Sequence, residues 1–300
     1  MAATTSVAVC TLNGAALLDE QLHSIASQAQ LPDELVICDD GSTDGTVGIL
    51  QGFVPEAPFR VRLYRNDRRL GYAKSVERAI SLCTGDLISL TPQDTVWMPD
   101  RLQRCVAALD AHPLAGVVSS DAGVLKPDER EHVTLGEAHA VLLHRNFVNG
   151  AGVTFRSECR GDIVPIPALW APDWWIALVV SLRWQVRLID EPLLVDPPPP
   201  ARPDPNPRHQ TEQWEAALER IGLIGREGAI NISVRDVAGL HARVRHLRSR
   251  ATLPTGRLFR VPVVARELLN GGYLRYSQGV AAALRDLSLP FSAVGGWRAG

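Results

Sequence analysis

Carboxylates gather where two apolar runs of this sequence end. The stretch 35–46, LVICDDGSTDGT, passes from apolar residues into Asp39 and Asp40, and the stretch 85–94, GDLISLTPQD, ends at Asp94. Residues of these types can present carboxylates to a ligand, but Gly, Ser and Asp are also the residues that ordinary turns use. The two interpretations, a ligand site and turn chemistry alone, both stay open at this point.

The elements that position these residues alternate between strand and helix through the first half of the chain. Such alternation predicts a parallel sheet covered by helices on both faces, with ligands bound beyond the carboxyl ends of the strands. Thr11–Gly14, Asp39–Asp40 and Thr91–Thr95 should therefore converge on one edge. The predicted strands are 6–12, 34–40, 59–66, 85–94 and 115–125, and the predicted helices are 17–28, one from about 44, 73–84 and 98–113.

A run of prolines divides the chain. The segment VDPPPPARPDPNP cannot form a helix or a central strand, because proline lacks the amide hydrogen and fixes its own φ. The segments after it, 211–224, 233–250 and 267–287, have helical periodicity. We therefore predict an α/β domain over 1–196, a proline-rich linker over 197–209 and a helical C-terminal region over 210–300.

Composition limits the class of protein and of partner. The 300 residues are 46% hydrophobic, enough for a sizeable core, and the formal net charge of -2 favours no nucleic-acid partner. Five scattered cysteines in apolar runs indicate reduced core thiols, and the N-terminus lacks the pattern of a signal peptide. The longest apolar segment, 174–180, is too short to span a bilayer. These features predict a cytoplasmic protein.

Six arginines lie in the C-terminal region in a stretch that has no acidic residue between Asp236 and Glu267. A basic face of this kind can contact an anionic membrane that carries a lipid-linked acceptor, which makes peripheral membrane association one interpretation. A solvated helix is the other. The arginines are Arg243, Arg245, Arg248, Arg250, Arg257 and Arg260.

Four blocks in order, 6–14, 35–46, 71–80 and 85–102, resemble the nucleotide-binding half of the family 2 glycosyltransferases, which have the GT-A fold. The stretch 171–194 resembles the acceptor half of the rhamnosyltransferase-like members, and 267–287 is weakly similar to their C-terminal segment. The resemblance implies a Rossmann-like nucleotide-binding sheet flanked by helices over about 1–120, an acceptor-binding part over about 121–196 and a helical appendage. It also implies an inverting hexosyl- or deoxyhexosyltransferase that uses a UDP- or dTDP-type nucleotide-sugar and a hydroxyl-bearing acceptor.

The same resemblance implies donor-binding roles. Asp40 matches the family's acid that accepts a hydrogen bond from the nucleobase, whose protonated ring nitrogen needs an acceptor. Thr11 and Asn13 match the loop that frames the base, and Gln93 lies beside the matched acid of the fourth strand. Lys74 starts a predicted helix and can meet a phosphate there, although a solvated surface lysine is an equal alternative.

Asp94 matches the acid that holds Mg²⁺ or Mn²⁺ against the diphosphate in the family's Asp-X-Asp element. This sequence departs from that element, because Pro92 and Thr95 stand where further acids are expected. The family's downstream histidine is also missing, and His209 is its only near substitute. One carboxylate can still suffice, since the diphosphate and water supply oxygen ligands, but the affinity for metal should be weak.

Asp173 matches the family's catalytic base, which takes the proton from the attacking acceptor hydroxyl. The alternative is structural, because Pro172-Asp173 is also a plausible helix start with an acid in its first turn. Trp170, Trp174 and Trp175 can form apolar walls for the acceptor, although core packing is the commoner fate of a tryptophan.

Two other functions compete with a glycosyltransferase. A nucleotidyltransferase shares the α/β architecture and the metal chemistry, but the first loop, TLNGAALL, lacks the glycine-rich, basic phosphate loop that such an enzyme needs. An inactive, transferase-derived binding module would explain Pro92 and the missing histidine. Retention of Asp40, Asp94 and Asp173 together argues for an enzyme.

Overall fold

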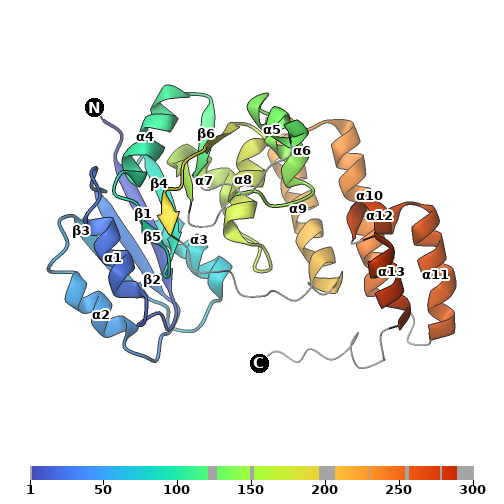
Figure 1. Cartoon of the computed structure of the whole chain (residues 1–300), viewed down its shortest axis with the longest axis horizontal. Coiled ribbons are helices and arrows are strands. Elements are labelled where there is room, and N and C mark those ends of the chain that lie inside the picture. Colours follow the sequence, from blue (N-terminus) through green and yellow to red (C-terminus); the bar gives the residue numbers. More distant parts are fainter. Residues whose placement is uncertain are drawn as a thin grey trace. The chain divides into compact units, whose positions relative to one another are not determined.

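The computed structural model describes residues 2–120, 127–148, 152–195, 207–228, 230–253, 257–277 and 279–288 (Figure 1). The chain divides into two compact units. The first, called here the α/β unit, comprises residues 1–200 and 224–231, and the second, the helical unit, comprises 201–223 and 232–300. The chain therefore leaves the α/β unit, returns to it for eight residues, and leaves it again.

The α/β unit is built on a seven-stranded sheet of order β3-β2-β1-β4-β7-β6-β8. All pairs are parallel except those of β7, which runs antiparallel to β4 and β6, so the prediction of a parallel sheet is wrong for this strand. A strand of four residues is too short to give a periodic signal in the sequence. The strands are β1 (Thr5–Thr11), β2 (Glu34–Asp39), β3 (Arg60–Arg65), β4 (Leu87–Pro92), β6 (Ala115–Ser120), β7 (Val153–Arg156) and β8 (Gln185–Ile189).

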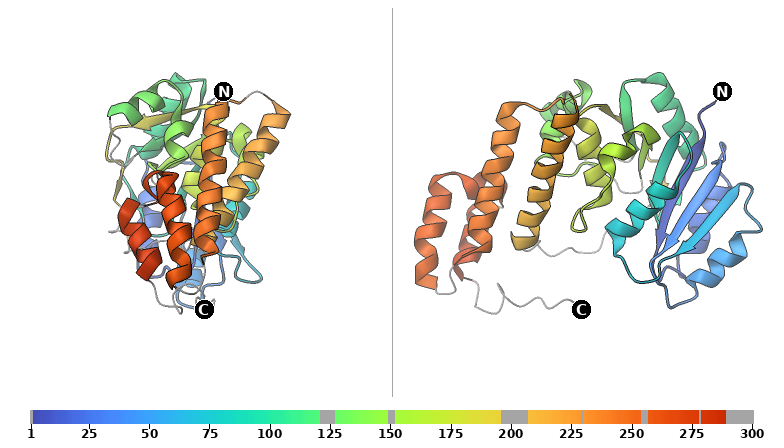
Figure 2. Two further views of the ribbon diagram at one scale, coloured as in Figure 1. Left: turned by 90° about the vertical axis from the view of Figure 1, so that its right-hand side faces the viewer. Right: turned by 180° about the vertical axis from the view of Figure 1, so that it is seen from behind.

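Helices cover both faces of the sheet, as predicted, and Figure 2 shows them from two further sides. A two-stranded ribbon of β5 (Val96–Trp97) and β9 (Leu194–Val195) adds to the unit. The helices are α1 (Leu18–Ala26), α2 (Thr46–Phe53), α3 (Tyr72–Leu82), α4 (Arg101–Ala111), α5 (Pro127–Thr134), α6 (Ala138–Leu142), α7 (Arg160–Ile163) and α8 (Pro172–Ser181).

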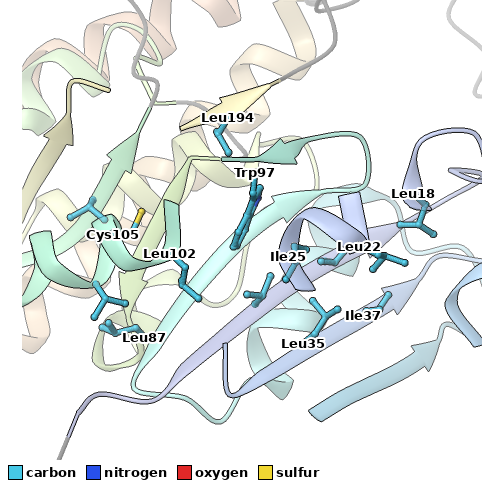
Figure 3. Close-up of a cluster of buried hydrophobic side chains, with 14 of the residues drawn as sticks. Leu18, Leu22, Ile25, Leu35, Ile37, Leu87, Trp97, Leu102, Cys105 and Leu194 are labelled. Atoms are coloured by element: carbon cyan, nitrogen blue, oxygen red, sulfur yellow. The ribbon is translucent and has the colours of Figure 1, made fainter. Parts of the chain in front are cut away.

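One hydrophobic core lies between the sheet and α1, α2 and α4. Figure 3 shows Leu22 and Ile25 of α1 beside Leu35 and Ile37 of β2, all fully buried. Burial of each such side chain stabilises the fold by about 1.5–3 kcal/mol. Trp97 extends this core to the β5–β9 ribbon. The strands are thereby held rigidly, with their carboxyl ends in fixed positions.

All five cysteines are buried free thiols, as predicted. Burial raises the pKa of Cys38 to about 11, and it raises the pKa values of Cys83 and Cys159 to about 12. These thiols therefore stay protonated at neutral pH and act as small core residues.

The helical unit contains α10 (Val234–Ala251), α11 (Arg257–Leu269), α12 (Gly272–Tyr276), α13 (Gly279–Ser288) and most of α9 (Pro207–Glu227). Residues 207–209, predicted as linker, begin α9 instead, and the rest of that linker lies outside the described residues. Ser233 and Asp236 form a capping box that starts α10. Among the described residues, no helix is long and apolar enough to cross a membrane.

Candidate active site at the carboxyl edge of the sheet

Four strands end in one row at the carboxyl edge of the sheet. The pairing register sets Thr11 beside Asp39, Asp39 beside Arg65, and Cys10 beside Pro92. The predicted convergence of the first, second and fourth strand ends is therefore confirmed. Any ligand bound at this edge would meet residues from all of these loops.

Asp39 organises the turn after β2. Its buried carboxylate accepts hydrogen bonds from the Thr11 hydroxyl at 3.0 Å and from the backbone N–H groups of Gly41 and Ser42 at 3.2 and 3.0 Å. Arg65 lies 3.6 Å from it on the exposed side. Thr11 is 1% exposed, and its hydroxyl is used to hold this turn. A nucleobase could therefore contact the loop that follows Thr11 but not the Thr11 hydroxyl.

Asp40 holds the loop that follows β3. Its carboxylate accepts hydrogen bonds from Asn66 Nδ2 at 2.8 Å and from the backbone N–H groups of Leu70 and Gly71 at 2.7 and 2.9 Å. Burial raises the pKa of Asp40, but these donors and the Ser75 side chain outweigh it and lower the pKa below its ordinary value. The group is thus ionised at neutral pH and acts as a hydrogen-bond acceptor for the loop after β3.

Asn66 was not among the residues predicted from the sequence. It directly follows β3, so the rule that polar residues at carboxyl ends of strands form the site would have found it. Arg78 hydrogen-bonds its side-chain oxygen. Asn66 thereby links Asp40, the candidate residue for nucleobase binding, to Arg78 on α3.

Asn13 and Gln93 shape the loop after β1. Asn13 has a φ of 49°, in the left-handed region that asparagine tolerates, and its Oδ1 accepts the backbone N–H of Thr43 at 2.9 Å. The Gln93 amide accepts from and donates to the backbone of Leu12, at 2.7 and 2.9 Å. A Cβ at Gly14 would lie 2.4 Å from Gln93 Oε1, so a larger residue there would displace the Gln93 side chain. Gln93 therefore joins the ends of β1 and β4.

Lys74 lies in the first turn of α3, as predicted, and is not a freely solvated side chain. Its ammonium group contacts Glu77 Oε2 at 2.7 Å, and the same oxygen accepts the backbone N–H of Ile166 at 2.7 Å. A phosphate would have to compete with Glu77 for this lysine.

Asp94 is an acidic residue at the carboxyl edge of the sheet whose side chain is available to bind a ligand. Its side chain is partly exposed, and within the described part of the chain it makes no hydrogen bond or ion pair. The described residues contain no cluster of three or more His, Cys, Asp or Glu side chains arranged to hold a metal ion. A cation at Asp94 would therefore need further oxygen ligands, which a bound diphosphate can supply.

Asp173 is the second residue of α8, where its carboxylate is partly exposed. Asn146 Nδ2 donates a hydrogen bond to Asp173 Oδ2 at 2.7 Å, and Asn146 Oδ1 accepts the backbone N–H of Val148 at 3.1 Å. The orientation of the carboxylate is therefore fixed by a side chain that is itself fixed. No pattern in the sequence around Asn146 indicates this role.

The three tryptophans divide between core and surface. Trp170 and Trp175 are 4% and 1% exposed and pack in the core, whereas Trp174 is partly exposed. The Trp174 ring lies against Trp170 at a centroid distance of 5.1 Å, and its indole N–H donates to the carbonyl of Leu142 at 2.7 Å. Of the three rings, Trp174, next to Asp173, is the one that has exposed surface.

Three of the six C-terminal arginines considered from the sequence take part in packing or pairing within the helical unit, whereas Arg245 and Arg248 are exposed. Arg243 stacks on Trp214 at 4.0 Å, and burial lowers its pKa to about 10. Arg250 pairs with buried Asp286 at 2.7 Å, and Arg260 is 1% exposed. These side chains stabilise the interior of the helical unit. His209 lies exposed on α9.

Comparison with known proteins identifies related sequences. The sequence profile of glycosyl transferase family 2 matches residues 6–147. A glycosyltransferase of PGL/p-HBAD biosynthesis from Mycobacterium bovis BCG is 36% identical over 193 residues, which are 63% of this chain and 71% of that protein. The chain spans 40% to 62% of the length of five other relatives that it matches.

Solved structures share the fold. S. aureus TarS 1–349, in complex with UDP-GlcNAc, has a TM-score of 0.61 at 15% identity and covers 97% of this chain and 83% of its own. The mannosyltransferase PcManGT from Pyrobaculum calidifontis, in complex with GDP-Man and Mn²⁺, has a TM-score of 0.57 at 21% identity, with coverage of 98% and 83%. The likeness shows a mixed α/β sheet of the GT-A type with a C-terminal helical region.

Proposed function

The chain belongs to glycosyl transferase family 2, and on this premise we propose that it transfers a sugar, with inversion, from a nucleotide-sugar to a hydroxyl-bearing acceptor. The observation that carries the proposal is the row of strand ends that brings Asp40 and the unpartnered Asp94 to one edge. The donor is of the UDP or dTDP type, and the sugar is a hexose or a deoxyhexose. The similar structures that bind UDP-GlcNAc and GDP-Man support a nucleotide-sugar donor.

In this proposal the donor's base lies over the loops after β1 and β2. Asp40 accepts the ring N–H of the pyrimidine in exchange for one of its present donors, and Asn13 and Gln93 hold the shape of the loop around the base. Lys74, at the start of α3, meets the diphosphate in exchange for its contact with Glu77. A divalent cation on Asp94 would neutralise charge on the departing diphosphate.

Asp173 serves as the general base. The acceptor oxygen attacks the anomeric carbon, the bond from that carbon to the diphosphate breaks, and the hydroxyl proton passes to Asp173. Because the hydroxyl becomes acidic only as it attacks, a carboxylate of ordinary basicity is sufficient in the transition state. Asn146 supports this role, since its hydrogen bond orients the Asp173 carboxylate at the start of α8. Trp174 offers a ring face to the acceptor.

A donor screen tests this function. The purified chain is incubated with UDP-, dTDP- and GDP-sugars and Mg²⁺ or Mn²⁺, and both thermal stability and slow hydrolysis of the donor are measured. A shift in melting temperature with release of the nucleoside diphosphate supports a transferase. Binding without any hydrolysis or transfer would indicate an inactive binding module instead.

Replacement of Asp40 by Ala should weaken binding of the nucleoside diphosphate by about 1–3 kcal/mol, the cost of leaving a desolvated donor without its acceptor. Isothermal calorimetry with UDP and dTDP measures this change. Because Asp40 also holds Leu70 and Gly71, the matched control is Asn66→Ala, which loosens the same loop but leaves the carboxylate in place. Unchanged affinity in Asp40→Ala, or an equal loss in both variants, would remove Asp40 from the nucleobase.

A further inference from the structure

One face of α11 is apolar and open to solvent. Phe259, Val261 and Leu269 are 73%, 51% and 89% exposed, while Arg260 and Val264 on the opposite side of the helix are each 1% exposed. The exposed positions between them include Pro262 and Ala265. Most helices of a folded unit show the reverse arrangement, with polar residues outward. The views of Figure 2 show α11 within the helical unit.

The apolar character continues on the next two helices. Leu274 of α12 is 66% exposed and Leu284 of α13 is 60% exposed. Single exposed apolar side chains are normal on protein surfaces. Several large exposed apolar side chains on three successive helices instead indicate a surface that binds a membrane or another protein. We call Phe259, Val261, Leu269 and Leu274 the apolar face.

The helices that carry the apolar face have no exposed acidic side chain among their described residues. After Asp236, residues 237–288 contain only two acids, Glu267 and Asp286, and both are buried. Glu267 contacts His246 Nδ1 at 2.8 Å, and Asp286 binds Arg250 at 2.7 Å and the Tyr273 hydroxyl at 2.7 Å. Both acids therefore bind partners inside the helical unit and add no negative charge to its surface.

Arginines are left on the outside. Arg245 and Arg275 are exposed, and Arg266 is 63% exposed although its guanidinium lies 3.6 Å from Glu267. Arg266 lies on the same exposed side of α11 as Leu269, and Arg275 directly follows Leu274. An occupant of this surface therefore has to be both apolar and negatively charged.

We propose that the apolar face of the helical unit docks on the surface of an anionic lipid bilayer. Apolar side chains that enter the interface, beside arginines that attract acidic headgroups, are the two contributions that hold peripheral helices on membranes. A second copy of the chain fits less well, because a two-fold contact joins the same surface of both copies and would bring the positive charges of Arg266 and Arg275 into one interface without acidic partners. The inference goes beyond the proposed function, since it needs neither the donor nor Asp173.

Vesicle sedimentation with the full chain tests the docking. The wild-type chain should bind vesicles of phosphatidylcholine mixed with phosphatidylglycerol, and the double variant Phe259→Ser/Leu269→Ser should bind at least about tenfold more weakly. The double variant Arg266→Gln/Arg275→Gln should lose affinity for the mixed vesicles and keep its weaker affinity for phosphatidylcholine alone. If both double variants behave in this way, binding depends on the apolar side chains and on the acidic headgroups of the bilayer.

The matched control is Leu114→Ser/Leu135→Ser, which removes two leucines of the α/β unit that are 69% and 66% exposed. This control should bind vesicles like the wild type, and all variants should keep the wild-type circular dichroism and nucleotide affinity. Absence of wild-type binding, or an equal loss in the control, would overturn the proposal. A concentration-dependent dimer that Phe259→Ser/Leu269→Ser dissociates in analytical ultracentrifugation would assign the face to a second copy instead.

Discussion

Replacing Asp173 by Asn is expected to lower the rate of sugar transfer by about 10²–10⁴-fold, the usual contribution of a general base. The affinity for the donor should change no more than a few-fold, because the amide has nearly the same volume and its oxygen can keep the hydrogen bond from Asn146. Turnover with a saturating donor and calorimetry with the nucleoside diphosphate measure the two quantities separately.

The chain supplies a matched control for the structural alternative. Asp128 is the second residue of α5 and also follows a proline, so it has the same position relative to its helix as Asp173. If an acid in the first turn acts only on the helix dipole, Asp128→Asn and Asp173→Asn should have similar small effects on stability and none on chemistry. Transfer at the wild-type rate by Asp173→Asn, or loss of nucleotide binding together with activity, would contradict the base assignment.

The second large effect concerns the metal at Asp94. One partly exposed carboxylate is a weak site, so Mg²⁺ or Mn²⁺ should bind measurably only when a nucleoside diphosphate supplies further oxygens. We expect a coupling of about 1–3 kcal/mol, which makes the nucleotide bind 5- to 150-fold more tightly with the cation than without it. Asp94→Ala should reduce this ratio to one in calorimetric titrations with and without Mn²⁺.

Asp100 provides the comparison for this experiment. It lies six residues beyond Asp94, pairs with Arg104 at 2.9 Å, and its replacement by Ala should leave the coupling intact. Tight binding of Mn²⁺ by the free chain would defeat the prediction, because it would require protein ligands beyond Asp94. Full activity in excess EDTA would also defeat it, and would point to Lys74 as the group that stabilises the leaving diphosphate.

The elements of the α/β unit were predictable because their apolar periodicity is strong. The predicted strand over 34–40 became β2 at Glu34–Asp39, and the predicted helix over 73–84 became α3 at Tyr72–Leu82. The direction of β7 was not predictable, since strand direction depends on contacts between residues that are distant in sequence. Nor was the start of α11 at Arg257, which comes ten residues before the last predicted helical segment.

At the site, position was easier to predict than hydrogen bonding. The rule for strand ends placed Thr11, Asp40 and Asp94 on one edge, and the register confirms it. The same rule does not say that the Thr11 hydroxyl binds Asp39 or that Asp40 holds a loop. These hydrogen bonds depend on backbone groups that folding brings close together. Because nearly every residue has a backbone N–H, the sequence does not indicate which one will be the donor. The family roles of these residues stay predictions.

Each of the two units is formed by two separate segments of the chain, which affects where the protein can be truncated and how it unfolds. Residues 224–231 belong to the α/β unit, where the carbonyl of Ile224 accepts from Arg183 at 2.8 Å and the N–H of Asn231 binds the carbonyl of Leu182 at 2.6 Å. The chain passes between the units after residues 200, 223 and 231. Truncation at 200 therefore removes a segment of the α/β unit together with the helical one, so neither unit is a continuous, independently excisable module. We expect calorimetric melting to be cooperative across both, in contrast to units joined by a single linker.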